Sequence, residues 1–415
     1  MRQKLGILTL GCPRNLVDAE TLAGRFNSQG YPIVNDLGQA QIALVNTCAF
    51  IEEARRESID VILDLIELKK QGKLKKIIVC GCLPQRYKDL KKHLPEVDAF
   101  IGNVEQDQAA GRFALTPHHY AYLKICEGCL NNCSYCIIPR IKGKLKSLDE
   151  QTIIQKVRRL NADKISELNI IGQDITGFGV DLGGASRLTD LLKRIIHNSP
   201  DISWIRLLYL NPERITDELL ELIATSKRLC KYIDLPIQHV NNRILKLMNR
   251  KITKAQMIAL IKKIRKIIPG LCLRTSLIVG FPSETKEEFK ELLEFIKEVK
   301  FDRLGAFIYS REEETAAYSF KGQIELPLKQ ERFDVIMSEQ QKIAAELNKR
   351  FLGQNISVLI EEQQDGAYIG RSQFDAPEVD GVVYVKTKKV LKAGEFTRVK
   401  ITDTLEYDLV GELKS

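Results

Sequence analysis

The stretch Cys129-Leu-Asn-Asn-Cys133-Ser-Tyr-Cys136 places three cysteines within eight residues. A loop of this length can direct three sulfurs toward one centre, and closely spaced thiols in a large chain favour metal binding. Structural zinc sites usually have four ligands, and no fourth Cys or His follows closely downstream. A 4Fe–4S cluster held by three thiolates leaves one iron open to another ligand. The spacing therefore favours such a cluster, with a zinc knuckle or redox thiols as the alternatives.

The region around this loop alternates apolar runs with amphipathic segments, which predicts β/α units in series. Six such units indicate a partial TIM-type barrel, a fold that carries its chemistry on loops after the strands. The expected strands are 122–125, 167–172, 204–210, 232–236, 273–281 and 303–310. The expected helices lie near 150–161, 187–198, 216–226, 252–268 and 284–299.

The N-terminal part has the same alternation and predicts a separate parallel α/β domain. Its expected strands are 5–10, 42–46, 76–81 and 99–101, with helices near 15–29 and 52–70. Cys12, Cys48 and Cys82 each follow one of these strands, and Cys80 is an extra thiol nearby. Strand ends of a parallel sheet lie along one edge, so these sulfurs can converge on a second metal site. Isolated buried thiols explain the same spacing.

The C-terminal part changes character after a long helix expected over 331–350. Short strands expected at 356–361, 382–385, 395–401 and 409–413 predict a small antiparallel β-barrel. The predicted domains are therefore 1–115, 116–345 and 346–415.

Length and composition agree with this organisation. The chain has 415 residues, enough for two to four domains, with 44% hydrophobic and 28% charged residues. These values exclude a disordered, collagen-like or membrane-spanning chain. The apolar stretch near the N-terminus is too short for a secretory signal. With ten cysteines and no export signal, we expect a cytoplasmic protein with thiols rather than disulfides.

Cys-x3-Cys-x2-Cys with Tyr135 before the last cysteine resembles the radical S-adenosylmethionine superfamily. The three predicted domains together resemble its methylthiotransferase branch, in which the small C-terminal barrel is the TRAM domain. Further motifs resemble the RimO type within that branch. They are Gly11–Glu20, Val45–Ile51, Tyr209–Glu213, Leu235–His239, Leu245–Arg250, Gly280–Thr285 and Asp375–Gly381.

The resemblance implies two 4Fe–4S clusters and S-adenosylmethionine as cofactors. It implies that Cys129, Cys133 and Cys136 hold the cluster that cleaves the cofactor. It also implies that Cys12, Cys48 and Cys82 hold an auxiliary cluster.

Polar residues at the expected strand ends are candidates for binding S-adenosylmethionine, because a barrel mouth gathers such side chains. Gln173 and Asp174 follow one strand, Gln238 and His239 follow another, and Arg274 lies within a third. Tyr135 is a candidate to pack against the adenine. Structural hydrogen bonding is the alternative for each of them.

The substrate implied by the RimO-type motifs is an aspartate of a small-subunit ribosomal protein, which would receive a methylthio group. A one-electron donor and a sulfur donor are the further expected partners. Residues 344–415 hold 10 basic and 12 acidic residues while the whole chain is +9, which suits a basic protein partner more than RNA. An ordinary surface charge is the alternative explanation. The alternatives are a transfer RNA adenosine methylthiotransferase and a non-catalytic iron–sulfur protein.

Overall fold

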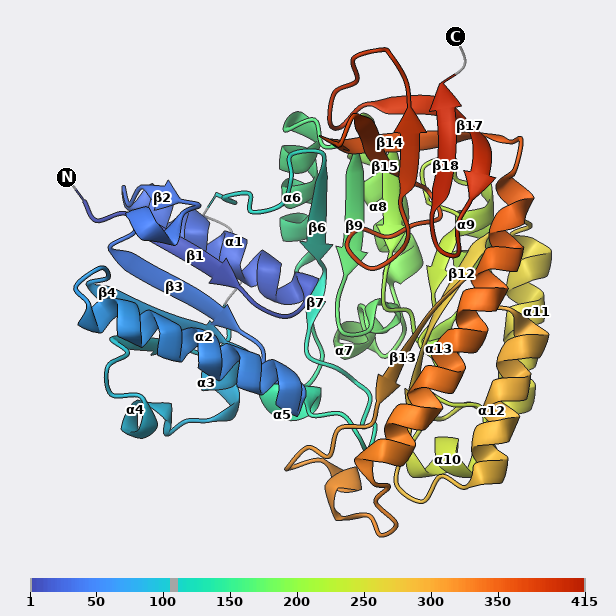
Figure 1. The fold of residues 1–415 in the computed structure, drawn as a ribbon, viewed down its shortest axis with the longest axis horizontal. Helices are drawn as coiled ribbons and strands as arrows, with labels where there is room; N and C mark the ends of the chain where they lie inside the picture. Colours follow the sequence, from blue (N-terminus) through green and yellow to red (C-terminus); the bar gives the residue numbers. More distant parts are fainter. Residues whose placement is uncertain (1, 105–110, 414–415) are drawn as a thin grey trace. The chain divides into compact units, whose positions relative to one another are not determined.

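Two compact units make up the structure, a computed structural model that describes residues 2–104 and 111–413 (Figure 1). The first unit comprises Met1–Pro117, Cys126–Leu148 and Ser310–Tyr318, and the second comprises the rest of the chain. The loop with the three close cysteines therefore belongs to the same unit as the N-terminal sheet. The domain boundaries predicted from the sequence stay predictions.

The first unit is built on a five-stranded parallel sheet in the order β2-β1-β3-β4-β5. The strands predicted in this region are confirmed, and β3 is buried along its whole length, as expected for a strand covered on both faces. β2 has only two residues, too few to show any alternation. The strands are β1 Leu5–Thr9, β2 Ile33–Val34, β3 Ile42–Thr47, β4 Lys76–Gly81 and β5 Ala99–Ile101.

Helices of the first unit begin close to the strand ends. α1 starts directly after Cys12, where Pro13 has the fixed φ that suits a first helical position. The close-spaced cysteines lie in the loop that runs from β7 to α5. The strand β8 follows α5 and pairs antiparallel with β7. The elements are α1 Pro13–Ser28, α2 Glu52–Lys70, α3 Cys82–Arg86, α4 Leu90–His93, β7 Cys126–Glu127, α5 Ile138–Ile141 and β8 Lys146–Ser147.

The second unit contains the six predicted barrel strands, paired in parallel in two sheets of order β10-β9-β6 and β11-β12-β13. Backbone hydrogen bonds join the two sheets, including one of 3.0 Å from Leu210 N to Asp234 O. The strands thus follow one another in chain order, as in a partial barrel. They are β6 Tyr120–Lys124, β9 Glu167–Ile171, β10 Trp204–Leu207, β11 Tyr232–Asp234, β12 Cys272–Val279 and β13 Arg303–Ile308.

Helices separate these strands along the chain, as the sequence predicts. α11 and α12 each begin with a full capping box, on Thr253 and Thr285, which explains their sharp starts. Among the described helices, none is long and apolar enough to pass through a membrane. The helices are α6 Glu150–Ala162, α7 Val180–Gly183, α8 Leu188–His197, α9 Asp217–Thr225, α10 Asn242–Leu247, α11 Lys254–Ile267, α12 Lys286–Val299 and α13 Leu326–Asn348.

The C-terminal strands form a closed barrel in the order β14-β15-β16-β18-β17. The expectation that it is wholly antiparallel is wrong for one pair, because β16 and β18 run parallel. A closed ring of five strands cannot alternate direction throughout, so one neighbouring pair must be parallel. β15 was missing from the prediction; it contains Gly370 and Arg371, which blur its apolar pattern. The strands are β14 Asn355–Gln364, β15 Ala367–Ser372, β16 Val383–Lys386, β17 Phe396–Thr404 and β18 Leu409–Leu413.

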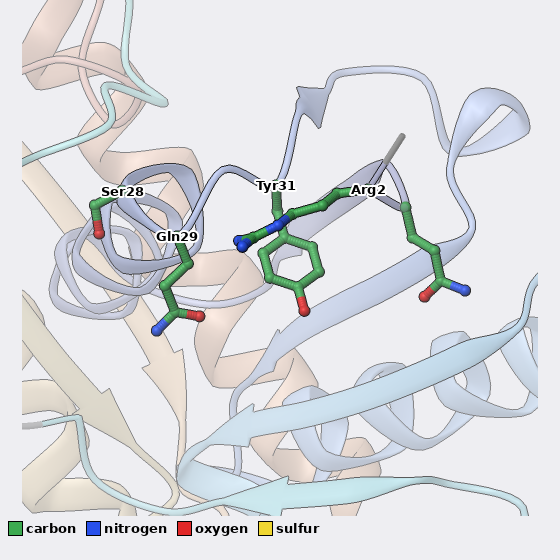
Figure 2. A pocket seen from close by; sticks show the side chains of 5 residues that line it. Arg2, Ser28, Gln29 and Tyr31 are labelled. Atoms are coloured by element: carbon green, nitrogen blue, oxygen red, sulfur yellow. The ribbon is translucent and has the colours of Figure 1, made fainter.

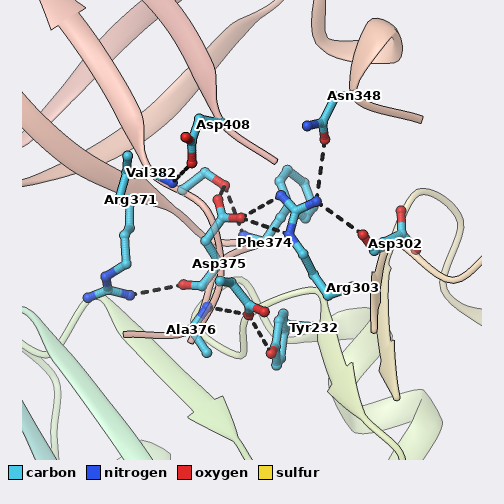
Figure 3. Close-up of polar contacts among 12 residues, drawn as sticks. Tyr232, Asp302, Arg303, Asn348, Arg371, Phe374, Asp375, Ala376, Val382 and Asp408 are labelled. Carbon is cyan, nitrogen blue, oxygen red and sulfur yellow. Dashed lines mark hydrogen bonds and ion pairs between the residues drawn. The ribbon is translucent and has the colours of Figure 1, made fainter. Parts of the chain in front are cut away.

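Buried polar contacts attach this C-terminal barrel to the first residues of strands in the partial barrel (Figure 3). Arg303 opens β13 and its Nη2 lies 2.6 Å from Asp375 Oδ1. Tyr232 opens β11, and its hydroxyl donates to Asp380 Oδ2 at 2.6 Å. Asp375 and Asp380 belong to one of the motifs quoted above, so this structure assigns that motif a role in attachment.

A second group of buried charges lies at the start of β9. Glu167 is fully buried between two guanidinium groups, Arg206 at 2.8 Å and Arg371 at 2.6 Å. Burial opposes the ionisation of Glu167, but the two arginines outweigh it and hold its pKa below the usual value. Arg371 also pairs with Glu361 at 2.8 Å, so two carboxylates balance two guanidinium groups within the protein.

Candidate functional site

Three cysteines lie at the carboxyl edge of the N-terminal sheet, directly after β1, β3 and β4. Cys12 caps α1, Cys48 is 8% exposed, and Cys82 is 6% exposed and opens α3. The strands are parallel and in register, with Leu8 opposite Val45 and Val45 opposite Val79. The structure therefore brings these three sequence-predicted residues to one edge of one sheet.

Asn15 ties the three strand ends together. Its Nδ2 donates to Leu10 O at 3.1 Å and to Thr47 O at 3.0 Å. The Cys82 thiol lies 3.7 Å from Asn15 Oδ1. Asn15 is fully buried on the first turn of α1, and its role escaped the sequence analysis. The available signal was a polar residue on the face of α1 that packs against the sheet.

Two glycines allow neighbouring strand ends to lie close together at this edge of the sheet. Gly11 has a φ of +90°, and a Cβ on it would lie 2.8 Å from the Cβ of Cys48. Gly81 has a φ of +94°, and a Cβ on it would lie 2.2 Å from Asn46 Oδ1. Neither position accepts a side chain without displacement of its neighbours. The cysteines that follow these glycines are thus held close to the other strand ends.

Burial and neighbouring charges shift the pKa values of these three thiols. Burial raises the pKa of Cys82 to about 12, and the charges of Cys48 and Cys12 add to this effect. Burial also raises the pKa of Cys48. Burial works against the Cys12 thiolate too, but the Arg14 charge and local hydrogen bonds outweigh it and lower that pKa. Three thiolates here repel one another, and bound cationic iron would favour their ionisation.

Cys80 is separate from this group. It is fully buried in a cluster with Leu5, Leu44 and Val104, whereas Cys82 packs in a different cluster. Burial raises the pKa of the Cys80 thiol. Cys80 is therefore a core residue of β4, in a different apolar cluster from Cys82.

The close-spaced cysteines form a second group within the same unit. Cys129, Cys133 and Cys136 are each partly exposed. Asn131 bonds to the Cys129 sulfur through its backbone N at 3.3 Å and its Nδ2 at 3.4 Å. Burial raises the pKa of Cys136 to about 12, with further contributions from the charges of Cys133 and Cys129. The three sulfurs are thus mutual electrostatic neighbours.

Both donor sets consist of thiols, the ligands that hold iron–sulfur clusters. Within residues 2–104 and 111–413, no three His, Cys, Asp or Glu side chains meet around the position of one metal ion. In a 4Fe–4S cluster each thiolate binds a different iron, so the sulfurs need not converge on one point. Each group offers three thiols, the donor type that such clusters use.

The predicted cofactor contacts after β9 lie at the carboxyl end of that strand. Asp174 accepts a hydrogen bond of 3.0 Å from Thr176 N and pairs with Arg214. Gln173 is its neighbour and is partly buried. Asp174 thus already has structural partners, and its role in binding stays a prediction.

The other predicted cofactor contacts in the second unit, Gln238 and Arg274, lie at different positions along the strands. Gln238 follows β11 with a φ of +69°, and its backbone bonds to Ser276 O and Ile278 N at 2.9 and 2.8 Å. Arg274 lies near the start of β12, where its guanidinium is 2.9 Å from Asp234 and 3.4 Å from Asp380. These carboxylates give Arg274 a structural role in attaching the C-terminal barrel.

Tyr135 belongs to the first unit with the cysteines that flank it, and it is partly buried.

Glu284 is a buried carboxylate that sequence reasoning missed. Its Oε2 accepts hydrogen bonds from Gly280 N at 2.7 Å and Phe281 N at 3.1 Å. Arg332 lies 3.0 Å from its other oxygen. Glu284 therefore shapes the turn after β12, and its place within the Gly280–Thr285 motif was the available signal.

A surface hollow elsewhere in the first unit is unrelated to the thiols (Figure 2). It is lined by Arg2, Gln3, Ser28, Gln29 and Tyr31, with the Arg2 guanidinium 5.4 Å from the Tyr31 ring centroid. Its lining contains neither a thiol nor a carboxylate.

Comparison with known families divides the chain into three matched segments. Residues 123–296 match the radical SAM superfamily, and residues 352–413 match the TRAM domain. Residues 4–102 match the uncharacterized protein family UPF0004.

Curated relatives match over the full length. The ribosomal protein uS12 methylthiotransferase RimO of Clostridioides difficile is 46% identical, covering 99% of this chain and 98% of the relative. The protein of the same name from Phocaeicola vulgatus is 43% identical over 99% of both chains. The chain belongs to the RimO family.

Solved structures with the radical SAM fold resemble this member of the RimO family. The methyltransferase TsrM from Kitasatospora setae superposes with a TM-score of 0.53 over 91% of this chain and 82% of that one, at 12% identity. The enzyme OxsB superposes with a TM-score of 0.51 over 82% of this chain and 57% of its own, at 13% identity. These matches establish the fold alone, and the assignment of residues to the cofactors stays a prediction.

Proposed function

We propose that the protein inserts a methylthio group at the β-carbon of an aspartate in ribosomal protein uS12. The observation that carries this proposal is the full-length similarity to proteins named for that activity, together with two groups of three thiols in one unit. A base cannot readily remove a proton from an unactivated carbon, so the insertion needs radical chemistry.

Cys129, Cys133 and Cys136 are the residues that would hold the radical-generating cluster. When bound, that cluster and S-adenosylmethionine supply a 5′-deoxyadenosyl radical that removes the hydrogen atom. The polypeptide contributes three thiolates, and Asn131 donates hydrogen bonds to one of them. Such hydrogen bonds stabilise negative charge on the sulfur.

Cys12, Cys48 and Cys82 are the residues that would hold the auxiliary cluster. When bound, that cluster supplies or carries the sulfur, and a second S-adenosylmethionine donates the methyl group. Asn15 contacts the backbone beside the first two strand ends and the thiol of Cys82, so it holds the three ligands in fixed relation. A one-electron donor and a sulfur donor complete the proposed set of partners.

We further propose that the enzyme works in the cytoplasm. Its ten cysteines suit a reducing compartment, and its proposed substrate belongs to the ribosome.

The decisive test compares uS12 by mass spectrometry from cells with and without this gene. We expect one methylthio group on an aspartate only where the gene is present. An unmodified uS12 together with a methylthiolated transfer RNA adenosine would replace the proposal with the transfer RNA alternative. In the purified protein, Cys133→Ala should abolish 5′-deoxyadenosine formation, and unchanged formation would exclude the radical assignment.

A further inference from the structure

A buried ion pair connects the two helices that follow the two thiol groups. Lys142 Nζ lies 3.2 Å from Asp18 Oδ2, and the two side chains are only 3% and 1% exposed. Asp18 lies on α1, which starts after Cys12, and Lys142 caps the end of α5, which follows Cys136. A more exposed carboxylate, Glu127, lies 3.7 Å from the same ammonium group.

A second buried ion pair connects the same regions at another point. Arg86 Nη1 lies 2.8 Å from Glu312 Oε2, with side chains 1% and 3% exposed. Arg86 ends α3, the helix that Cys82 opens, and the same nitrogen donates to Ala49 O at 2.8 Å, directly after Cys48.

The segment that carries Glu312 also contacts the close-spaced cysteine loop. Ala317 N donates a hydrogen bond of 2.8 Å to Ser134 O, between Cys133 and Cys136. The residues 310–318 therefore connect the auxiliary thiols, through Arg86, to the loop of the other thiols.

These polar contacts accompany apolar packing that would hold the segments together without them. Ile137 and Ile141 are buried in one cluster with Cys82 and Leu83. Apolar burial has no preferred direction, whereas an ion pair is directional. A buried ion pair adds little stability over an apolar pair of the same size, because both charges lose their hydration. A buried ion pair instead fixes the relative position of the two elements that carry its charges.

We propose that Asp18–Lys142 and Arg86–Glu312 are positioning contacts that set the distance and orientation between the two thiol groups. This inference rests on the proposed function, because transfer of sulfur between sites requires a defined separation. None of the four residues is assigned to the iron, the cofactor or the substrate. Arg86 and Glu312 act through the elements that carry the cysteines, and Asp18 and Lys142 do so while their opposite charges also reach Cys82.

The test uses Glu312→Gln and Lys142→Met in the full chain with both clusters reconstituted. Matched controls are Glu313→Gln and Lys144→Met, which change exposed side chains close in the sequence. Three quantities are measured: iron per chain, the magnetic interaction between the two reduced clusters, and the yields of 5′-deoxyadenosine and methylthio product.

In the two test variants we expect unchanged iron and unchanged 5′-deoxyadenosine, but an altered magnetic interaction. Methylthio product should fall by about ten- to a hundredfold, the usual effect of a misplacement near 1 Å. The controls should match the parent in every quantity. Parent-like magnetic interaction and product yield in the test variants would overturn the proposal.

If Lys142→Met loses iron against this expectation, the unpaired buried charge of Asp18 is one cause, which a second variant separates from the positioning role. The double variant Asp18→Asn/Lys142→Met removes both charges and should retain its iron while the magnetic interaction and product yield still change. Loss of iron in the double variant would show a purely structural role and overturn the proposal. The magnetic measurement needs no substrate. If the parent fails to modify uS12 while the magnetic interaction still changes, the proposed function fails and the positioning role stands.

Discussion

The thiol groups of the first unit and the ion pairs beneath the barrel strands of the second differ in how their buried charges are balanced. Glu167 lies between Arg206 and Arg371 and needs nothing from outside the protein. Cys12, Cys48 and Cys82 would repel one another as thiolates. Buried charges that balance internally indicate structure, whereas buried thiols that would repel one another as thiolates suit the binding of a cationic cluster.

The largest expected effect tests the thiol side of this comparison. Cys82→Ala should lower reconstituted iron from about eight to about four per chain and abolish methylthio product, because one three-thiolate site is lost. Cys80→Ala is the control and should keep about eight irons. Equal iron loss in both variants would contradict the separation of Cys80 from the site.

The next largest effect is expected for the buried ion pairs around Glu167. Arg206→Met leaves Glu167 with one guanidinium partner and should lower the free energy of unfolding by about 3–5 kcal/mol. Urea unfolding of the second unit measures this change, while iron content should stay at the parent value. Lys263→Met breaks an exposed pair with Asp217 in the same unit and should change stability by less than about 1 kcal/mol. A similar loss of unfolding free energy in both variants would mean that burial does not increase the contribution of an ion pair to stability.

A pH-dependent effect of comparable size is expected at His239. Burial lowers its pKa to about 4, while Glu288 and Glu291 favour its charged form. The unfolded chain, with a histidine pKa of about 6.5, takes up the proton first as pH falls. This contribution to stability is therefore complete above pH 6.5 and lost as pH falls toward 4, by about 3 kcal/mol.

Unfolding measured across this pH range checks the His239 prediction. His239→Gln should flatten the decline in stability between pH 6.5 and 4, whereas His93→Gln, an exposed residue, should leave it unchanged. An unaltered pH profile in the His239 variant would assign the decline to other groups.

The smallest effect concerns a helix start far from either group of charges. Thr253→Ala removes the capping box of α11 and should destabilise that helix by about 1 kcal/mol. Hydrogen exchange in the first turn of α11 should become faster, and Thr253→Ser should restore it. Unchanged exchange in the alanine variant would show that the cap is dispensable.

Much of the fold was predictable because its signals are local. The alternation of apolar runs predicted the parallel strands of the N-terminal sheet and the six strands of the partial barrel. β2 and β15 were missed, since a two-residue strand and a strand interrupted by glycine and arginine carry little periodicity. The parallel pair β16–β18 follows from ring closure, a property of the assembled barrel.

The sequence by itself determined the donor chemistry, because three thiols within one loop and one thiol after each of three strands are visible as spacing. The tertiary structure placed Cys80 and Cys82 in different apolar clusters. Residues two apart share a face in a regular strand, but the left-handed φ of Gly81 ends β4 and turns Cys82 into α3. The tertiary structure alone also paired Asp18 with Lys142 and Arg86 with Glu312, because partners this distant in the chain meet only when the chain has folded.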